Sequence, residues 1–342
     1  MEDIMYSNSD KSEASVLTDM LIVLLVLAAV AVYYYGLRAA LVIALAVVTC
    51  CLTDFICIKL RKKDTMAGDV SAIVTGLTLS LMMPASAPYF AVIAASVFAV
   101  AAAKQAFGGL GCEIFNAAAA GFLFISLCFP DNILTYPEAF GNISFSSIVP
   151  ADILGQSMTK SFIATGTSSV DVLDILVGKF RGPMGTGFAA ILVVAALFLV
   201  FRRSVSAIAL SAEIVVSGGT AFLLGDFDFR SVLYFMAGGM TLFGMLFLSC
   251  GYSTMPTTRS SRLVYGVIVG VLVSLLHFYS GTENAIVYAV IIAAPFGIEL
   301  DKRSLSFAEM LKNKKGIFFR RNKSLKHMQE TLEILDKNDR ES

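Results

Sequence analysis

The chain has 342 residues, of which 57% are hydrophobic and only 15% are charged, and its mean hydropathy is +0.77. These values exclude an ordinary soluble domain of this length and indicate an integral membrane protein. The 26 basic and 26 acidic residues cancel, so the net charge gives no sign of a nucleic-acid partner, and we expect none.

Apolar runs follow one another along the chain. A helix needs about 20 apolar residues to cross roughly 30 Å of hydrocarbon. The runs lack the alternation typical of β-barrel strands, so the sequence predicts an all-α integral membrane protein with about ten transmembrane helices. The runs cover residues 16–35, 37–58, 70–83, 89–107, 114–130, 186–201, 205–225, 231–249, 262–280 and 283–299.

The orientation follows from Lys and Arg, which the cytoplasmic side of a membrane protein collects. With the first run read as a retained helix that starts inside, the basic residues gather on one side. They are Lys59, Arg61, Lys62, Lys63, Lys104, Arg202, Arg203, Arg259, Arg262, Lys302 and Arg303. Both termini are therefore predicted to be cytoplasmic.

These runs and loops predict the domain organisation. A cytoplasmic N-terminus (1–15) precedes a first transmembrane half (16–130), and an extracytoplasmic segment (131–185) leads to a second half (186–300). The cytoplasmic tail (301–342) is basic and then amphipathic, with apolar residues at helical spacing from Leu325 to Leu335. Such a tail is typical of a segment that rests on anionic lipid or on a partner.

Metal and catalytic motifs are not evident. The six cysteines show no C-x-x-C spacing and there are only two histidines, so we predict no metal site and no catalytic residue.

The string "KQAFGGLGCEIFN", Lys104 to Asn116, places polar residues and glycines between two apolar runs. Gly108 and Gly109 would let the backbone approach a ligand, and the side chains would supply hydrogen bonds that lipid cannot. The polar side chains in question are those of Gln105, Glu113 and Asn116. The simpler interpretation is a cytoplasmic turn with glycine at a helix end and Glu113 at the start of the next helix.

A weak internal repeat links the two halves. Met83-Pro84 recurs 172 residues later as Met255-Pro256, and Gly109 recurs at the same offset as Gly281. Five helices per half is an odd number, so the halves would be inverted relative to each other, as in many transport folds.

Three stretches resemble a known family: "DVSAIVTGLTLSLMMPASAPYF" from Asp69, "AAAKQAFGGLGCEIFNAA" from Ala101 and "STMPTTRSSRLVYG" from Ser253. They are similar to RnfD, a membrane component of the Rnf electron-transport complex, and to NqrB, its relative in the sodium-pumping NADH:quinone oxidoreductase. The similarity covers nearly all of residues 16–300. The resemblance implies a bacterial cytoplasmic (inner) membrane, ten helices in two inverted five-helix halves, and the other subunits of an Rnf-type complex as partners.

The resemblance also implies FMN, joined by a phosphodiester to a hydroxyl on the outer side of the membrane. The family motif D-x-x-[ST]-G-A-T corresponds to "FIATGTS", with Thr165 and Gly166 at the [ST]-G positions and Ser168 at the modified position. Thr167 is the alternative acceptor. Phe162 replaces the aspartate of the motif, and its loss would weaken recognition by the flavin transferase that attaches FMN. Cofactor contacts are further predicted for Lys104, Gly108, Gly109 and Asn116.

We therefore predict a membrane flavoprotein subunit that passes electrons while the assembled complex couples ferredoxin and NAD chemistry to ion movement. Such a subunit has no complete reaction alone. A second, non-covalent flavin is left open. The family's T-D-P reads Cys250-Gly251-Tyr252 and its F-N-P-A reads "FNAA" from Phe115, so the chain is also a candidate divergent paralogue. The rival interpretation is a flavin-free channel or transporter built on the same inverted repeat.

Overall fold

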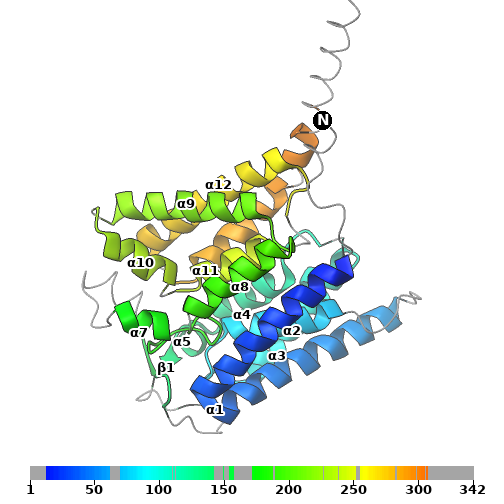
Figure 1. The fold of residues 1–342 in the computed structure, drawn as a ribbon. Helices are drawn as coiled ribbons and strands as arrows, with labels where there is room; N and C mark the ends of the chain where they lie inside the picture. Colours follow the sequence, from blue (N-terminus) through cyan, green and yellow to red (C-terminus); the bar gives the residue numbers. More distant parts are fainter. Residues whose placement is uncertain are drawn as a thin grey trace, which may run out of the picture.

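The structure is a computed structural model that is mostly helical (Figure 1). It describes residues 13–61, 70–109, 111, 113–141, 149, 154–157, 172–187, 189–225, 227–237, 239–251, 255–281, 283–297, 299–304 and 306. Helices of the first half (blue to cyan) lie together, and those of the second half (green to orange) form a neighbouring group.

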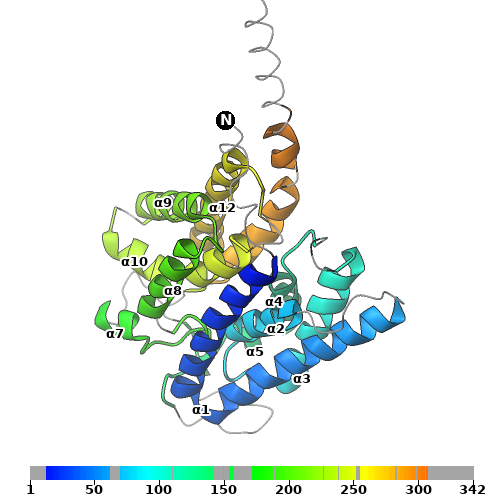
Figure 2. The same ribbon diagram turned by 45° about the vertical axis from the view of Figure 1, so that its right-hand side comes forward.

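Helix α1 (Glu13–Leu60) consists of two legs that meet at Gly36. Gly36 has φ 69° and ψ −159°, a conformation that is open to glycine and strained for other residues. The legs form a V in Figures 1 and 2, with Gly36 between them. A straight helix of 48 residues would measure about 72 Å, more than twice the thickness of a bilayer core. The bend turns this length into two apolar legs, as the two separate runs of the sequence predicted.

The remaining helices of the first half pack against α1. Their bounds are α2 (Val70–Met82), α3 (Tyr89–Phe98), the π-helix η2 (Ala99–Lys104), the 3₁₀ turn η3 (Gln105–Phe107) and α4 (Ala117–Cys128). The packing of α2 on α1 depends on Gly76, because a Cβ there would lie 2.8 Å from the Cα of Val47.

The segment between the halves contains short elements. They are α5 (Pro130–Ile133), β1 (Tyr136–Pro137), β2 (Leu154–Gly155) and α7 (Val172–Val177). The two strands pair in antiparallel fashion, Tyr136 opposite Gly155, and this small sheet is a departure from the predicted all-α fold.

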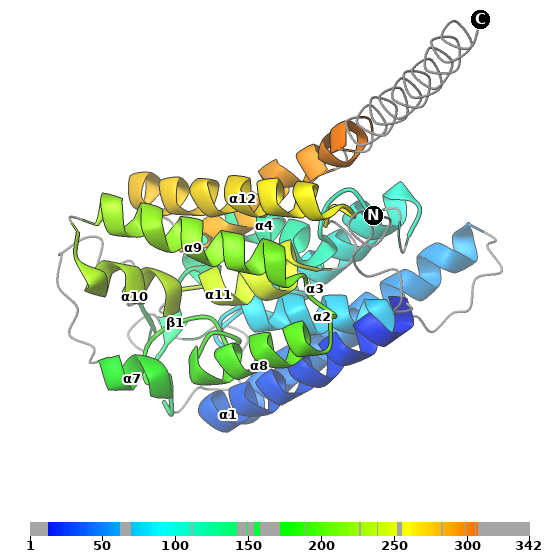
Figure 3. The same cartoon turned by 45° about the horizontal axis from the view of Figure 1, so that its top comes forward.

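The second half begins with α8 and repeats the alternation of helices and short turns. Its elements are α8 (Ala189–Phe201), α9 (Ala207–Leu224), α10 (Phe229–Ala237), α11 (Thr241–Gly244), the π-helix η4 (Met245–Ser249), α12 (Arg259–Ser280) and helical stretches at 285–297 and 299–304. Helices α9 and α12 pack along each other (Figure 3).

Every apolar run predicted from the sequence contains helix, but helix length alone does not confirm ten crossings. Within the described residues, four helices are long and apolar enough to span a membrane, and α10 with α11–η4 adds a fifth if that pair, bent by 56°, is one span. One of the four is the two-legged α1. Helices α2, α4 and α8 have only 12 or 13 residues, about 20 Å at 1.5 Å per residue. The membrane-protein prediction is confirmed, and the count of ten spans stays a prediction.

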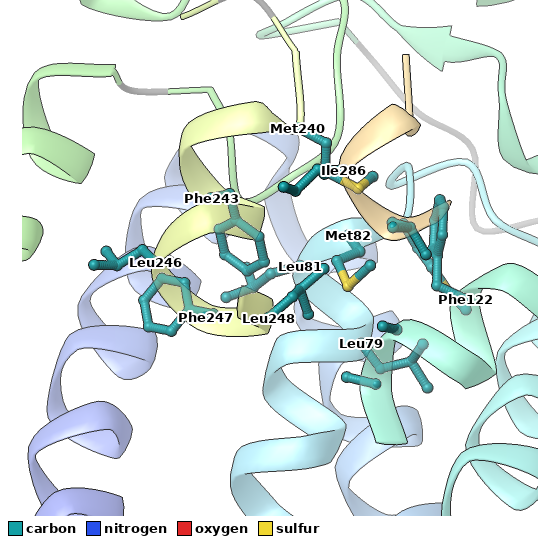
Figure 4. Close-up of a cluster of buried hydrophobic side chains, with 14 of the residues drawn as sticks. Leu79, Leu81, Met82, Phe122, Met240, Phe243, Leu246, Phe247, Leu248 and Ile286 are labelled. Carbon is teal, nitrogen blue, oxygen red and sulfur yellow. The ribbon is translucent and has the colours of Figure 1, made fainter. Parts of the chain in front are cut away.

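The core lies where the two halves meet (Figure 4). Leu81 of α2 lies beside Phe243 of α11 and Leu248 of η4, whereas Leu79 points toward α4. Leu79, Leu81 and Met82 are all fully buried. Ile286, which is also buried, packs so closely that a Cβ on Gly244 would lie 2.5 Å from it. The halves therefore share one hydrophobic core.

Candidate functional site

The glycine-containing string from Lys104 to Asn116 begins where α3 changes its winding. The helix continues as the π-helix η2 and the 3₁₀ turn η3, and then Gly108, Gly109 and Gly111 adopt φ values of 127°, 91° and 81°. The amide of Gly108 donates to Gln105 O and that of Gly109 to Lys104 O. These hydrogen bonds close the helix end, which is the ordinary role of glycine at this place.

Lys104 and Gln105 point into the protein, where both contact Asp54 on the second leg of α1. The Lys104 Nζ lies 3.2 Å from Asp54 Oδ1, and the Gln105 amide donates to the same oxygen at 2.7 Å. Arg61 Nη1 donates to Gln105 Oε1 at 3.4 Å. The side chains of Lys104 and Asp54 are 1% and 6% exposed. Lys104 therefore forms a buried ion pair and is a poor marker of the cytoplasmic side, although the charge count used it as one.

Asn116 connects the string to the second half of the chain. Its Oδ1 accepts a hydrogen bond from the amide of Ala119, which makes it the N-cap of α4. Its Nδ2 lies 3.3 Å from the carbonyl oxygens of Phe247 and Leu248 in η4. One side chain thus begins a helix of the first half and holds the π-helix of the second.

Glu113 precedes α4 by four residues, so it lies outside the first turn of that helix. This overturns the simpler placement of its charge at the helix start. It is half-buried and lines a cavity of about 40 Å³ together with Asn116, Thr75, Thr78 and others. A cavity of this size has room for a few water molecules and is far smaller than a cofactor pocket.

An apolar groove lies on the other side of the string. It has a volume of about 400 Å³, which is within the range of ligand pockets. The rings of Phe107 and Phe115 pack edge to face beside it, and Phe98 stacks on Phe124. Its wall is almost wholly apolar, so it can accept a hydrophobic group but has few groups that could orient a polar ligand.

Arg38 is a buried polar residue whose role the sequence did not indicate. It is 1% exposed and lies just past the bend of α1. Its guanidinium donates to the carbonyl oxygens of Ala85, Ser86 and Ala87 at 2.8 to 3.5 Å, and it lies over the ring of Tyr89. Arg38 therefore holds the turn that follows the Met83-Pro84 motif.

The predicted attachment residues Thr165, Gly166, Thr167 and Ser168 lie outside the described residues. The nearest described elements on either side are β2 and α7. Helix α7 is held to α1, because the Tyr34 hydroxyl donates to the Val177 carbonyl at 2.5 Å.

The comparison with known protein families covers both halves of this architecture. The model of the NQR2, RnfD, RnfE family matches residues 3–302. The chain belongs to this family. The resemblance seen in the three sequence stretches is thereby confirmed.

Relatives in this family are subunits of ion-translocating complexes. The chain is 28% identical over 281 residues to the D subunit of the Na(+)-translocating ferredoxin:NAD(+) oxidoreductase complex of Acetobacterium woodii, covering 82% of this chain and 86% of that protein. It is 26% identical over 293 residues to the D subunit of the proton-translocating ferredoxin:NAD(+) oxidoreductase complex of Clostridium ljungdahlii, covering 83% and 87%. The D subunit of the ion-translocating oxidoreductase complex of Yersinia pestis is 26% identical over 298 residues, covering 76% and 84%.

The described residues fit the predicted FMN only in part. Lys104 and Asn116 already have protein partners, and the amides of Gly108 and Gly109 close the helix end. A flavin near the string would therefore meet backbone and aromatic rings more than free polar side chains. A role for these four residues in flavin binding stays a prediction.

Proposed function

We propose that this chain is the membrane flavoprotein subunit of an Rnf-type complex in a bacterial cytoplasmic membrane. It carries electrons through covalently bound FMN, while the complex couples ferredoxin and NAD chemistry to ion translocation. The observation that carries the proposal is the family match over residues 3–302, which spans both halves and the outer segment with its Thr165-Gly166-Thr167-Ser168 hydroxyls. Bound FMN supplies the electron carrier, and the protein anchors and surrounds it.

Ten spans in two inverted halves form part of this proposal. The offset of 172 residues that relates Met83-Pro84 to Met255-Pro256 also carries the range of α3–η3 onto α12, and it carries that of α4 to 289–300, which overlaps the helical stretch 285–297. Gly109 and Gly281, each just past the end of one of these helices, both have left-handed φ, 91° and 62°. A two-fold repeat explains why helices of similar order and ending recur in each half.

The topology has a direct test. A reporter fused after Ser342 should report the cytoplasm, and one inserted at Asn142 should report the opposite side. The same side for both reporters would contradict the odd number of crossings between them.

Covalent FMN is tested on the full-length chain, produced together with a flavin transferase of a related complex. We expect the denatured wild-type chain to keep flavin fluorescence and to gain the mass of one FMN less one water, which is lost when the phosphodiester forms. Ser168→Ala should lose both signals, while Ser169→Ala, a hydroxyl removed next to it, should keep them. Loss in Thr167→Ala instead would move the acceptor to Thr167.

A flavin-free channel or transporter is the second candidate, favoured by Phe162 in place of the motif's aspartate. The same experiment decides between them. A wild-type chain without adduct, in cells where a related RnfD protein is flavinylated, would overturn the flavoprotein proposal and support the transporter.

A further inference from the structure

A buried carboxyl group lies in the second half, away from the string. Glu213 is on α9, one of the apolar helices long enough to span a membrane, and its side chain is fully buried. Its Oε1 accepts a short hydrogen bond from Ser249 Oγ at the end of η4, and the Cys250 thiol lies 3.9 Å from the same oxygen. Its Oε2 and the hydroxyl of Tyr265 on α12 have no hydrogen-bond partner among the described residues.

The surroundings of Glu213 disfavour a permanent negative charge. Within the described part of the chain, no basic side chain forms an ion pair with it. A buried carboxylate without a counter-charge is strongly unfavourable, whereas the protonated acid is neutral and has a hydrogen to donate. The facing groups that titrate are the Cys250 thiol and the Tyr265 phenol, and the positive charge of Arg262 on α12 acts on Cys250.

A cavity large enough for water lies next to the cluster of Glu213, Ser249, Cys250 and Tyr265. A cavity of about 180 Å³ is lined by Cys250, Ser204, Ser206, Arg203 and Arg262, among others. This volume holds several water molecules. Because Cys250 belongs both to the cavity wall and to the neighbourhood of Glu213, the carboxyl group lies one side chain behind the cavity. The wall includes Arg203, which lies in the turn between α8 and α9.

We propose that Glu213 is a proton-binding site that is loaded from this cavity. The carboxylate takes a proton from hydronium to give the neutral acid and one water molecule, and release is the reverse, with no electron transferred. A metal cation fits less well. The described cluster offers two carboxylate oxygens and the hydroxyls of Ser249 and Tyr265, whereas hard cations take about six oxygen ligands. The approach is lined by the guanidinium groups of Arg203 and Arg262 and by one carboxylate, that of Glu13, so its described charges are more positive than negative. The site does not depend on bound flavin.

The test is infrared difference spectroscopy on the full-length chain in lipid, at rest and without electron transfer. Wild type minus Glu213→Gln should show one carboxylic-acid C=O band, which shifts when D₂O replaces H₂O. The ratio of protonated to ionised Glu213 should fall about tenfold for each unit by which the pH rises. The matched control Glu299→Gln removes an exposed carboxylate and should leave this band unchanged. If Glu213→Gln fails to fold, Glu213→Asp keeps an acid and should move the band.

Three results would each overturn the proposal. The first is that no acid band is seen at any of the pH values at which the protein stays folded. The second is a band that does not respond to D₂O, since a proton loaded from the cavity must exchange with water. The third is a band that Na⁺ removes and K⁺ does not at constant pH, since that would make the site a sodium site.

Discussion

The ion pair between Lys104 and Asp54 gives the sharpest test of the string's role in the fold. Lys104→Met keeps a long side chain and removes the ammonium group that lies 3.2 Å from Asp54 Oδ1. The Asp54 carboxylate would then stay buried, and the amide of Gln105 would be its one remaining donor among the described residues. Breaking a buried pair in this way typically costs about 3–5 kcal/mol, because it leaves an uncompensated charge.

The double variant Asp54→Asn with Lys104→Met separates this cost from ordinary loss of packing. It removes both charges, and neutral replacement of a buried ion pair is often close to harmless. We therefore expect the double variant to be more stable than Lys104→Met alone, with a coupling energy of about 2–3 kcal/mol. Lys302→Met, on an exposed lysine, is the matched control and should change stability little.

The chain suits a thiol-based unfolding assay, because it has no tryptophan, and Cys50 and Cys250 are buried and free. A maleimide dye that fluoresces on reaction reports the temperature at which these thiols become accessible. At about 2–4 °C per kcal/mol, the midpoint of Lys104→Met should fall by about 6 °C or more. A midpoint within about 1 °C of wild type, or a double variant that is worse than the single one, would refute the reasoning.

Three further substitutions test the packing and the links between segments. Arg38→Met leaves three carbonyl oxygens without their donor and should cost about 2–4 kcal/mol, seen as a lower unfolding midpoint in the same thiol assay. Gly76→Val forces α2 away from α1 and should reduce the amount of folded protein recovered in detergent. In the control Gly219→Val, a Cβ at position 219 would have no neighbour within 4 Å, so the recovered amount should stay the same. Asn116→Ala loses both the N-cap of α4 and the link to η4, so the protein should lose about 1–3 kcal/mol of stability in the thiol assay, and wild-type stability in Asn116→Ala would contradict the link.

Helix positions followed from the sequence because each depends on local composition. A run of apolar residues is recognisable without knowledge of its neighbours, and even the break in α1 was visible as a gap between two runs at Gly36. The number of crossings did not follow in the same way. A helix as short as α2, with 13 residues, does not by its length show whether it crosses the membrane by itself. The ends of such helices depend on tertiary contacts, which the local sequence does not reveal.

The partners in the string could not be predicted, because they are distant in sequence. Asp54 lies 51 residues before Gln105, and the carbonyls of η4 that Asn116 contacts lie more than 130 residues after it. The glycines, by contrast, could be interpreted from their residue type. Gly109 shows the limit of that approach: a Cβ there would meet Gln105 at an ordinary 3.6 Å, so its backbone angle, and not a lack of room, demands glycine.

Charged residues within apolar runs are visible in any sequence, but only their contacts separate structural from functional roles. The guanidinium of Arg38 donates to backbone carbonyls, and the ammonium of Lys104 pairs with the carboxylate of Asp54. These contacts stabilise the fold, so each residue has a structural role. Glu213 has one oxygen without a partner among the described residues, and the Cys250 thiol lies beside its other oxygen. A carboxyl group buried at such cost is better explained by a bound proton than by packing, because a leucine would fill a similar volume and leave one neutral hydroxyl, that of Ser249, without this acceptor.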